Sequence, residues 1–131
     1  MSGILLDTHT FLWWSLSPEK LSLKVLDTLR DSSTKVMLSV VSCWEIQIKL
    51  GLGKLLLKAP LKAIVEREIR ENCLEILPVC LAHTWKLESL PPLHKDPFDR
   101  ILVAQALVEN LVIATKDPLV SIYPTVRSIW N

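Results

Sequence analysis

The amino-acid sequence predicts an α/β protein with three layers, in which a central parallel sheet of four to five strands lies between two layers of helices. Short apolar runs alternate with segments of helical character along the whole chain, and this alternation favours a parallel sheet that is covered on both faces. The chain has 131 residues and shows no internal repeat or low-complexity tract. We therefore expect residues 1–131 to form a single domain.

Four apolar runs are the predicted strands, because each has a length typical of a strand rather than a helix. The first run ends at Asp7, which would stand at the carboxyl end of its strand. The four runs, and a fifth segment that would add an edge strand, are residues 3–6, 35–38, 74–79, 111–114 and 126–130.

Helices are expected between these runs. Asp96-Pro97 is typical of a helix start, because aspartate is a good N-cap and proline fits the first helical position. Gly51 is expected to take the left-handed conformation just past the end of a helix. A further helix, beginning at Pro60, is amphipathic. Its predicted apolar face consists of Leu61, Ile64, Val65 and Ile69.

The composition is unusually apolar for a chain of this length. Half of the residues are hydrophobic, and the mean hydropathy is +0.33. The longest apolar stretch, residues 101–114, is interrupted by Gln105 and Glu109 and falls short of the roughly 18 residues of a membrane span. Asp7 interrupts the first apolar segment in the same way, so we expect no signal peptide. We expect the excess of hydrophobic residues to form the core and one apolar surface that contacts a partner.

The cysteines and the net charge indicate the cellular compartment and the kind of partner. Cys43, Cys73 and Cys80 are odd in number and lack zinc-finger spacing, which favours reduced thiols in the cytoplasm. The net charge of +1 at first argues against a polyanionic partner. That count misleads if several acids surround a cation, because the remaining surface is then basic. Basic residues do gather between positions 49 and 70, although solvated helix faces explain them as well.

Five isolated acids are expected near one edge of the sheet. Asp7 and Asp117 follow the first and fourth predicted strands, and Glu45 lies in the helix after the second. Asp96 and Asp99 begin the helix before the fourth strand, and they reach the edge only if that helix lays its N-terminus over it. In an open α/β sheet, ligands bind at the edge shared by the strand ends and the starts of the following helices.

Each acid also has a purely structural explanation. Asp7 and Asp96 can cap helices, Ser42-x-x-Glu45 matches a capping box, and Asp117-Pro118 is a common turn. Capping explains a convergence of all five less well, because neighbouring carboxylates repel one another. A hard divalent cation such as Mg²⁺ or Mn²⁺ removes this repulsion and suits phosphodiester hydrolysis.

Four segments carry these acids in a recognisable order. They are Leu5-Leu6-Asp7-Thr8-His9-Thr10, residues 39–46 with Glu45, His94-Lys95-Asp96-Pro97-Phe98-Asp99-Arg100 with the helix after it, and residues 111–117, which end in Thr-x-Asp. Together they resemble the motifs of PIN-domain ribonucleases, in particular the small VapC toxins of type II toxin–antitoxin systems. The resemblance covers nearly the whole chain.

This resemblance implies a PIN-like fold and Mg²⁺-dependent (or Mn²⁺-dependent) cleavage of RNA within the chain. It also implies inhibition by a cognate antitoxin and a homodimer. The residues that match the metal-binding acids of the family are Asp7, Glu45, Asp99 and Asp117.

Asp99 is preferred to Asp96, because the apolar run after it has the register of the family's helix. Asp96 is then an N-cap or an auxiliary acid. Thr8 and Thr115 could orient ligands. Arg100 and His94 could contact the scissile region, or serve as a salt bridge and a structural histidine.

Two other classes of protein are alternatives. A phosphotransfer domain also gathers aspartates at the edge of a parallel sheet. The haloacid-dehalogenase pattern, however, needs a second Asp two residues after Asp7, where this chain has His9. A receiver domain needs an acidic pair that is absent before the candidate Asp. The second alternative is an interaction module that keeps the fold without nuclease activity, and the retention of four acids argues against it.

Overall fold

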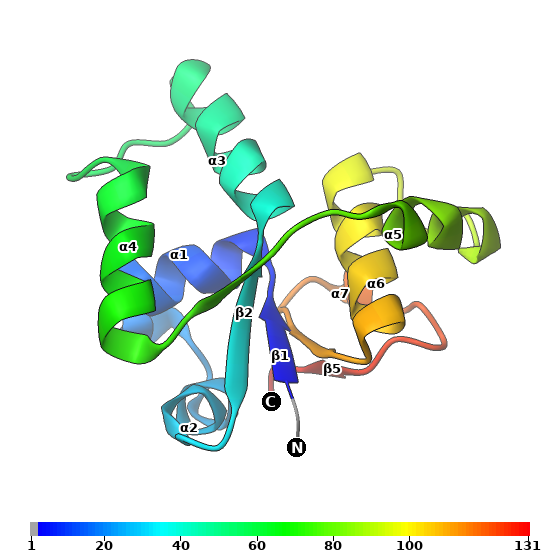
Figure 1. The fold of residues 1–131 in the computed structure, drawn as a ribbon, viewed down its shortest axis with the longest axis horizontal. Helices are drawn as coiled ribbons and strands as arrows, with labels where there is room; N and C mark the ends of the chain where they lie inside the picture. The colour runs from blue at the N-terminus through cyan, green and yellow to red at the C-terminus, as the bar shows by residue number, and fades with distance from the viewer. Residues whose placement is uncertain (1–2) are drawn as a thin grey trace.

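The computed structural model describes residues 3–131 and contains one sheet of five parallel strands (Figure 1). The strands are β1 (Gly3–Leu6), β2 (Lys35–Ser39), β3 (Glu75–Leu77), β4 (Val112–Ala114) and β5 (Ser128–Ile129). Their order across the sheet is β3-β2-β1-β4-β5, and every neighbouring pair is parallel. The predicted fold class is confirmed, and the fifth predicted segment does form a short edge strand.

Helices cover both faces of the sheet. Figure 1 shows α1 (Thr8–Leu16) and α4 (Leu61–Asn72) on one side of the strands, and α5 (Leu81–Lys86), α6 (Pro97–Glu109) and α7 (Pro118–Ser121) on the other. The remaining helices are α2 (Leu23–Arg30) and α3 (Val40–Gly51), with short 3-10 turns η1 (Pro18–Lys20) and η2 (Leu87–Ser89). No helix within residues 3–131 combines the length and the apolar character needed to cross a membrane.

The two faces of the sheet carry separate hydrophobic clusters. Ile4 and Leu6 of β1 pack on the side of α1, α2 and α4, whereas Leu5 packs on the side of α6. This division follows from strand geometry, because successive side chains point to opposite faces. β1 is therefore apolar at every position, and all four of its residues are buried.

The position of β1 determines where the sheet can bind a ligand. β1 lies between β2 and β4. From β1 the chain adds β2 and β3 on one side and then crosses to add β4 and β5 on the other, and such a switch point is where α/β sheets bind ligands. The Asp7 amide donates to the carbonyl of Ala114 at 3.2 Å, and Thr10 Oγ1 donates to the same carbonyl at 3.0 Å. These bonds hold the carboxyl ends of β1 and β4 side by side.

Three local predictions are wrong. Gly51 is the last residue of α3, and the left-handed glycine is Gly53, with φ 71°. Ser39, whose side chain accepts from the Val41 amide, caps α3, so Ser42 and Glu45 lie within the helix and do not form a capping box. Ile69, placed on the apolar face of α4, is 42% exposed.

Candidate metal centre

All five predicted acids line one cavity of about 190 Å³ at the carboxyl edge of the sheet. They come from the end of β1, from α3, from the start of α6 and from the segment after β4. Asp96 and Asp99 were expected at this edge only if the N-terminus of their helix lies over it, and the N-terminus of α6 does. The residues that line the cavity are Asp7, Thr8, His9, Glu45, Lys49, His94, Asp96, Asp99 and Asp117.

Thr8 and Lys49 hold Glu45 in place. Thr8 Oγ1 donates to Glu45 Oε1 at 2.7 Å and lies 3.1 Å from Ser42 Oγ. Lys49 Nζ lies 3.1 Å from Glu45 Oε2, one helical turn further along α3. Glu45 is only 8% exposed, so these contacts offset the cost of burying its charge. Thr8 acts here by positioning an acid of the cavity.

Asp7 has two tasks at the end of β1. Its Oδ1 caps α1 by accepting from the Thr10 amide at 2.8 Å. The carboxylate nevertheless lines the cavity. Capping of α1 therefore does not remove this side chain from the cavity.

Asp96 and Asp99 are held differently at the start of α6. Asp96 Oδ1 is the N-cap and accepts from the amides of Phe98 at 2.8 Å and Asp99 at 3.3 Å. Asp99 Oδ2 lies 2.8 Å from His94 Nε2, while the Asp96 amide donates to His94 Nδ1 at 3.4 Å. These two contacts assign the ring proton to Nε2, which donates to the Asp99 carboxylate.

Asp99 is the acid whose protonation the site perturbs most clearly. Burial raises the pKa of Asp99 from its ordinary value of 3.8 to about 6, and repulsion from Asp96 adds to the rise. The hydrogen bond from His94 opposes the rise, and Glu45 adds a smaller repulsion. A cation in the cavity would favour the ionised carboxylate, because opposite charge stabilises the charged form.

Asp117 closes the cavity from the segment after β4. Its Oδ1 caps α7 by accepting from the Leu119 amide at 2.9 Å, and its own amide donates to Thr115 Oγ1 at 3.0 Å. Its Oδ2 lies 3.7 Å from His94 Nε2. Thr115 is buried and does not line the cavity, so it acts on the site only through the backbone of Asp117.

Arg100 does not line the acidic cavity. Its guanidinium donates to the carbonyl of Pro91 at 3.0 Å, to Tyr123 Oη at 3.1 Å and to the carbonyl of Leu87 at 3.5 Å. It therefore ties α6 to the preceding loop and to the segment after α7. No salt bridge within residues 3–131 includes Arg100, so the salt bridge expected as its structural role is not formed, and its contact with the scissile region stays a prediction.

Sequence reasoning missed two residues of the cavity, Lys49 and His9. Lys49 carried a usable signal, because it stands four residues after Glu45 and residues at that spacing meet on a helix face. His9 carried none beyond its place in the first motif.

The donor set fits a hard divalent cation. Carboxylate oxygens are the ligands that Mg²⁺ and Mn²⁺ prefer, and five carboxylates share this cavity with one lysine ammonium group. Atoms of His94, Asp99 and Asp117 that could bind a metal lie within 4.8 Å of one another. The acids therefore supply more negative charge than their protein partners offset.

A second group of ligand-type residues is Cys80, His83 and Glu109, with atoms within 4.8 Å of one another. Both nitrogens of His83 are already engaged. Nδ1 accepts from the Cys80 amide at 3.1 Å, and Nε2 lies 2.9 Å from Glu109 Oε2. This group is a hydrogen-bonded link between α5 and α6.

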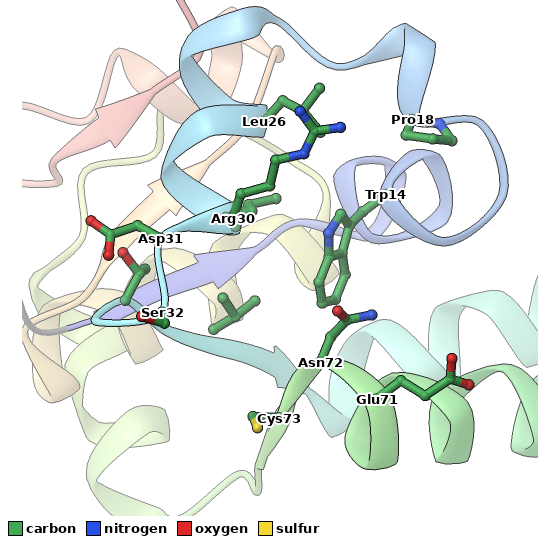
Figure 2. Close-up of a pocket in the computed structure, with 12 residues that line it drawn as sticks. Trp14, Pro18, Leu26, Arg30, Asp31, Ser32, Glu71, Asn72 and Cys73 are labelled. Carbon is green, nitrogen blue, oxygen red and sulfur yellow. The ribbon is translucent and has the colours of Figure 1, made fainter.

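A larger cavity, of about 450 Å³, lies away from the acids. Figure 2 shows its carboxylates Asp31 and Glu71 on opposite sides, with Trp14 and Asn72 between them. Asp31 Oδ1 accepts from the amide and the hydroxyl of Ser33, and Glu71 pairs with Arg70 at 3.6 Å. Carboxylates that are separated and already paired do not form a metal site.

The amino-acid sequence matches a known protein family and a known ribonuclease. Residues 4–121 match the model of the PIN domain family. The chain is 25% identical over 118 residues to Ribonuclease VapC22 of Mycobacterium tuberculosis, a match that covers 89% of this chain and 88% of that protein.

Two solved structures share the fold over almost the entire chain. They are VapBC2 from Rickettsia felis bound to a promoter DNA fragment, with a TM-score of 0.74, and DNA-bound VapBC from Salmonella typhimurium, with a TM-score of 0.68. Each is 17% identical in sequence and covers 98% of this chain, which in turn covers 99% and 98% of the matched chains. The family match spans most of the sequence and includes all five acids, with Asp117 close to its end. The chain therefore belongs to the PIN domain family, with the fold of its VapC-type members.

Proposed function

We propose that this protein is a metal-dependent endoribonuclease that hydrolyses phosphodiester bonds of RNA and serves as the toxin of a type II toxin–antitoxin pair. The observation that carries the proposal is the convergence of five carboxylates from four separate segments on one cavity of about 190 Å³. The relative Ribonuclease VapC22 supports RNA as the substrate. We further propose that residues 1–131 act as one PIN-like domain, because all five strands belong to one sheet.

Asp7, Glu45, Asp99 and Asp117 would hold Mg²⁺ or Mn²⁺, with Asp96 as an auxiliary acid. When bound, such an ion polarises the phosphodiester and lowers the pKa of a water molecule that attacks phosphorus. Thr8 fixes the orientation of Glu45 through its 2.7 Å hydrogen bond. His94 holds Asp99 and approaches Asp117 with the same nitrogen, so it couples two of the acids.

Cleavage of a single-stranded RNA in the presence and absence of Mg²⁺ tests this function. Asp7→Asn and Glu45→Gln keep the size of the side chain and remove one charge each, and asparagine also caps a helix well. Both variants should fold and lose cleavage by orders of magnitude. Lys62→Gln, an exposed change on α4, is the matched control and should cleave like the unaltered protein. Metal-independent cleavage, or full activity in both acid variants, would contradict the proposal. No cleavage by the unaltered protein with Mg²⁺ would favour an interaction module.

We also propose that a segment of a cognate antitoxin docks in an apolar groove beside the acids. The groove has a volume of about 470 Å³ and is lined by Val40, Val41, Trp44, Val79, Thr84, Pro97, Phe98 and Ile101. Trp44 and Phe98 adjoin Glu45 and Asp99 in sequence, and their rings pack edge to face at 5.2 Å. An apolar peptide in the groove could thus place a basic side chain against the acids, and the VapBC complexes among the structural neighbours support such a partner.

A homodimer and a cytoplasmic location complete the proposal. Leu81 and Trp85 of α5 are 67% and 68% exposed, which suits contact with a second copy. The free cysteines suit a reducing compartment. Sedimentation at several protein concentrations tests the dimer, and a strictly monomeric protein would contradict it.

A further inference from the structure

A second cavity adjoins the acidic one and differs from it in chemistry. It has a volume of about 380 Å³ and is lined by Asp7, His9, Trp13, Lys116 and Asp117. Asp7, His9 and Asp117 line both cavities, so the two spaces adjoin at these three side chains. Whatever occupies the second cavity therefore lies directly beside the acids.

Aromatic rings form one wall of this second cavity. The rings of His9 and Trp13 stand one turn apart on α1, with centroids 5.9 Å apart and planes inclined by 36°. Trp130 packs edge-on against Trp13, with centroids 5.8 Å apart, and supports its position. His9 is exposed, and Trp13 is only partly buried, so aromatic surface faces solvent next to the acids.

The charges of the second cavity point to a base in the cavity and a phosphate at its rim. Asp7 and Asp117 would repel a phosphate placed between them and the rings. Lys116, an exposed residue, adds the positive charge, and it forms no salt bridge with any residue from 3 to 131. Aromatic side chains beside a cation are the means by which proteins bind single-stranded nucleic acid, since every base has a face that can stack.

We infer that His9, Trp13 and Lys116 form a subsite that holds one unpaired nucleobase of an RNA strand next to the bond that is cleaved. The base stacks on the His9–Trp13 wall, and the phosphate attached to its nucleotide pairs with Lys116. This inference rests on the proposed function and adds to it a binding position for one unpaired base beside the acids. Paired RNA would be a poor substrate, because its bases are already stacked and cannot reach the wall.

An abasic scan tests the subsite. A single-stranded RNA is prepared with one base removed at each position in turn around the cleaved bond, and kcat/KM is measured with Mg²⁺. One position should show a loss on the order of tenfold with the unaltered protein, in keeping with base stacking on an aromatic residue. In His9→Ala and Trp13→Leu the intact RNA should be the poorer substrate, and removal of that base should cost little more.

Binding without cleavage gives an independent readout. The affinity of the labelled intact RNA is measured by fluorescence anisotropy in EDTA. Trp13→Leu and Lys116→Gln should each weaken it several-fold, and Lys116→Gln should also reduce its salt dependence.

Matched controls separate stacking from loss of core packing. Trp14 neighbours Trp13 and packs against the same core cluster, but it faces the distant cavity of Figure 2. Trp14→Leu should therefore leave the abasic profile and the affinity unchanged, as should Lys62→Gln. His9→Ala keeps the test valid if Trp13→Leu does not fold, because His9 is exposed.

The outcomes separate this inference from the proposed function. If RNA is cleaved and the same position loses the same factor in His9→Ala or Trp13→Leu, the subsite is wrong while the nuclease proposal stands. If Trp14→Leu acts like Trp13→Leu, the effect is one of packing and the subsite is again wrong. If RNA binds through Trp13 but is not cleaved with metal, the nuclease proposal fails and the aromatic wall remains only as an RNA-binding surface. Protein that neither binds nor cleaves RNA contradicts both.

Discussion

Two aspartates at the start of α6 show how neighbouring residues of one type take different tasks. Asp96 Oδ1 accepts from two backbone amides, which is the geometry of a helix cap. Asp99 Oδ2 contacts His94, and burial raises the pKa of this carboxyl group. Asparagine can replace the first function, because its side-chain oxygen also accepts from amides. It cannot replace a charge that binds a cation.

The Asp99→Asn and Asp96→Asn variants should therefore differ. Asp99→Asn should fold with equal or greater stability, because repulsion from Asp96 and Glu45 is relieved, and RNA cleavage should fall by orders of magnitude. Asp96→Asn should cost little in stability and keep appreciable activity. Cleavage rates and thermal unfolding of both variants check this. Loss of activity in Asp96→Asn with activity retained in Asp99→Asn would assign the metal to Asp96 instead.

The raised pKa of Asp99 predicts a pH dependence of folding. Since the pKa is raised to about 6 in the folded protein from 3.8, the fold favours the protonated form. This contribution to stability is fully present below pH 3.8 and is lost as pH rises through about 6. The free energy of unfolding in EDTA should thus decline across this window relative to Asp99→Asn. Urea unfolding at a series of pH values measures it.

The control for this pH series is Asp27→Asn, an exposed change on α2. It should leave the decline intact. An Asp99→Asn protein whose stability follows the same pH curve as the unaltered protein would show that Asp99 is not the group responsible.

At the scale of elements, α4 shows where pattern reading fails. Its periodicity assigns Ile69 to the apolar face, yet Ile69 is 42% exposed and Glu68 is 4% exposed. Glu68 can be buried because side chains from α1 and α4 bind its carboxylate. Ser15 Oγ donates at 2.9 Å from α1, Asn72 Nδ2 donates at 2.7 Å, and Arg67 lies 3.3 Å away. Periodicity cannot reveal this, since it carries no information about the neighbouring helix.

Replacement of Glu68 should weaken the contact between α1 and α4. Glu68→Leu leaves the polar groups of Ser15 and Asn72 without their partner, so we expect a loss of about 1–3 kcal/mol in the free energy of unfolding. Urea unfolding measures this loss. Glu66→Leu, on the exposed face of the same helix, should change stability by much less. Equal effects of the two variants would mean that the buried network contributes nothing specific.

The ends of elements were predicted with mixed success, for identifiable reasons. Asp96-Pro97 correctly marks the start of α6, because both residues act locally. Asp117-Pro118 is the same kind of pair and begins α7, a helix of 4 residues. The pair predicts a turn instead, because aspartate and proline are also common in turns. Gly51 was assigned the left-handed position that Gly53 holds, since two glycines near one helix end offer equivalent signals.

At the scale of the whole molecule, topology explains why the acidic cavity was predictable. The carboxyl ends of parallel strands share one edge, so the order of strands and acids along the chain places Asp7, Glu45 and Asp117 together. Contacts that depend on loop conformation were not predictable. The contact of His94 with two acids and the inward turn of Arg100 towards Pro91 and Leu87 both require the path of residues 91–96.

The cavity also joins distant parts of the fold, and this predicts a global effect of metal. Asp7 follows the central strand β1, and Glu45 belongs to the helix after β2 on one side of it. Asp99 and Asp117 belong to segments that precede and follow β4 on the other side. A cation held by all four acids would relieve the repulsion between them, so it should stabilise only the folded chain. At a metal concentration ten times Kd, the gain should be about 1.4 kcal/mol.

Thermal unfolding with increasing Mg²⁺ or Mn²⁺ measures this gain, and EDTA should reverse it. Asp7→Asn should lose most of the shift, because one of the four charges is gone while the helix cap remains. Lys62→Gln should keep the whole shift, since it lies on α4 away from the cavity. Mg²⁺ gives up its waters reluctantly, so its binding should be weak. Half of the shift in unfolding temperature is expected at a Mg²⁺ concentration on the order of millimolar. An unfolding temperature that does not respond to either metal, or a shift that Asp7→Asn keeps in full, would mean that the acids do not hold a cation together.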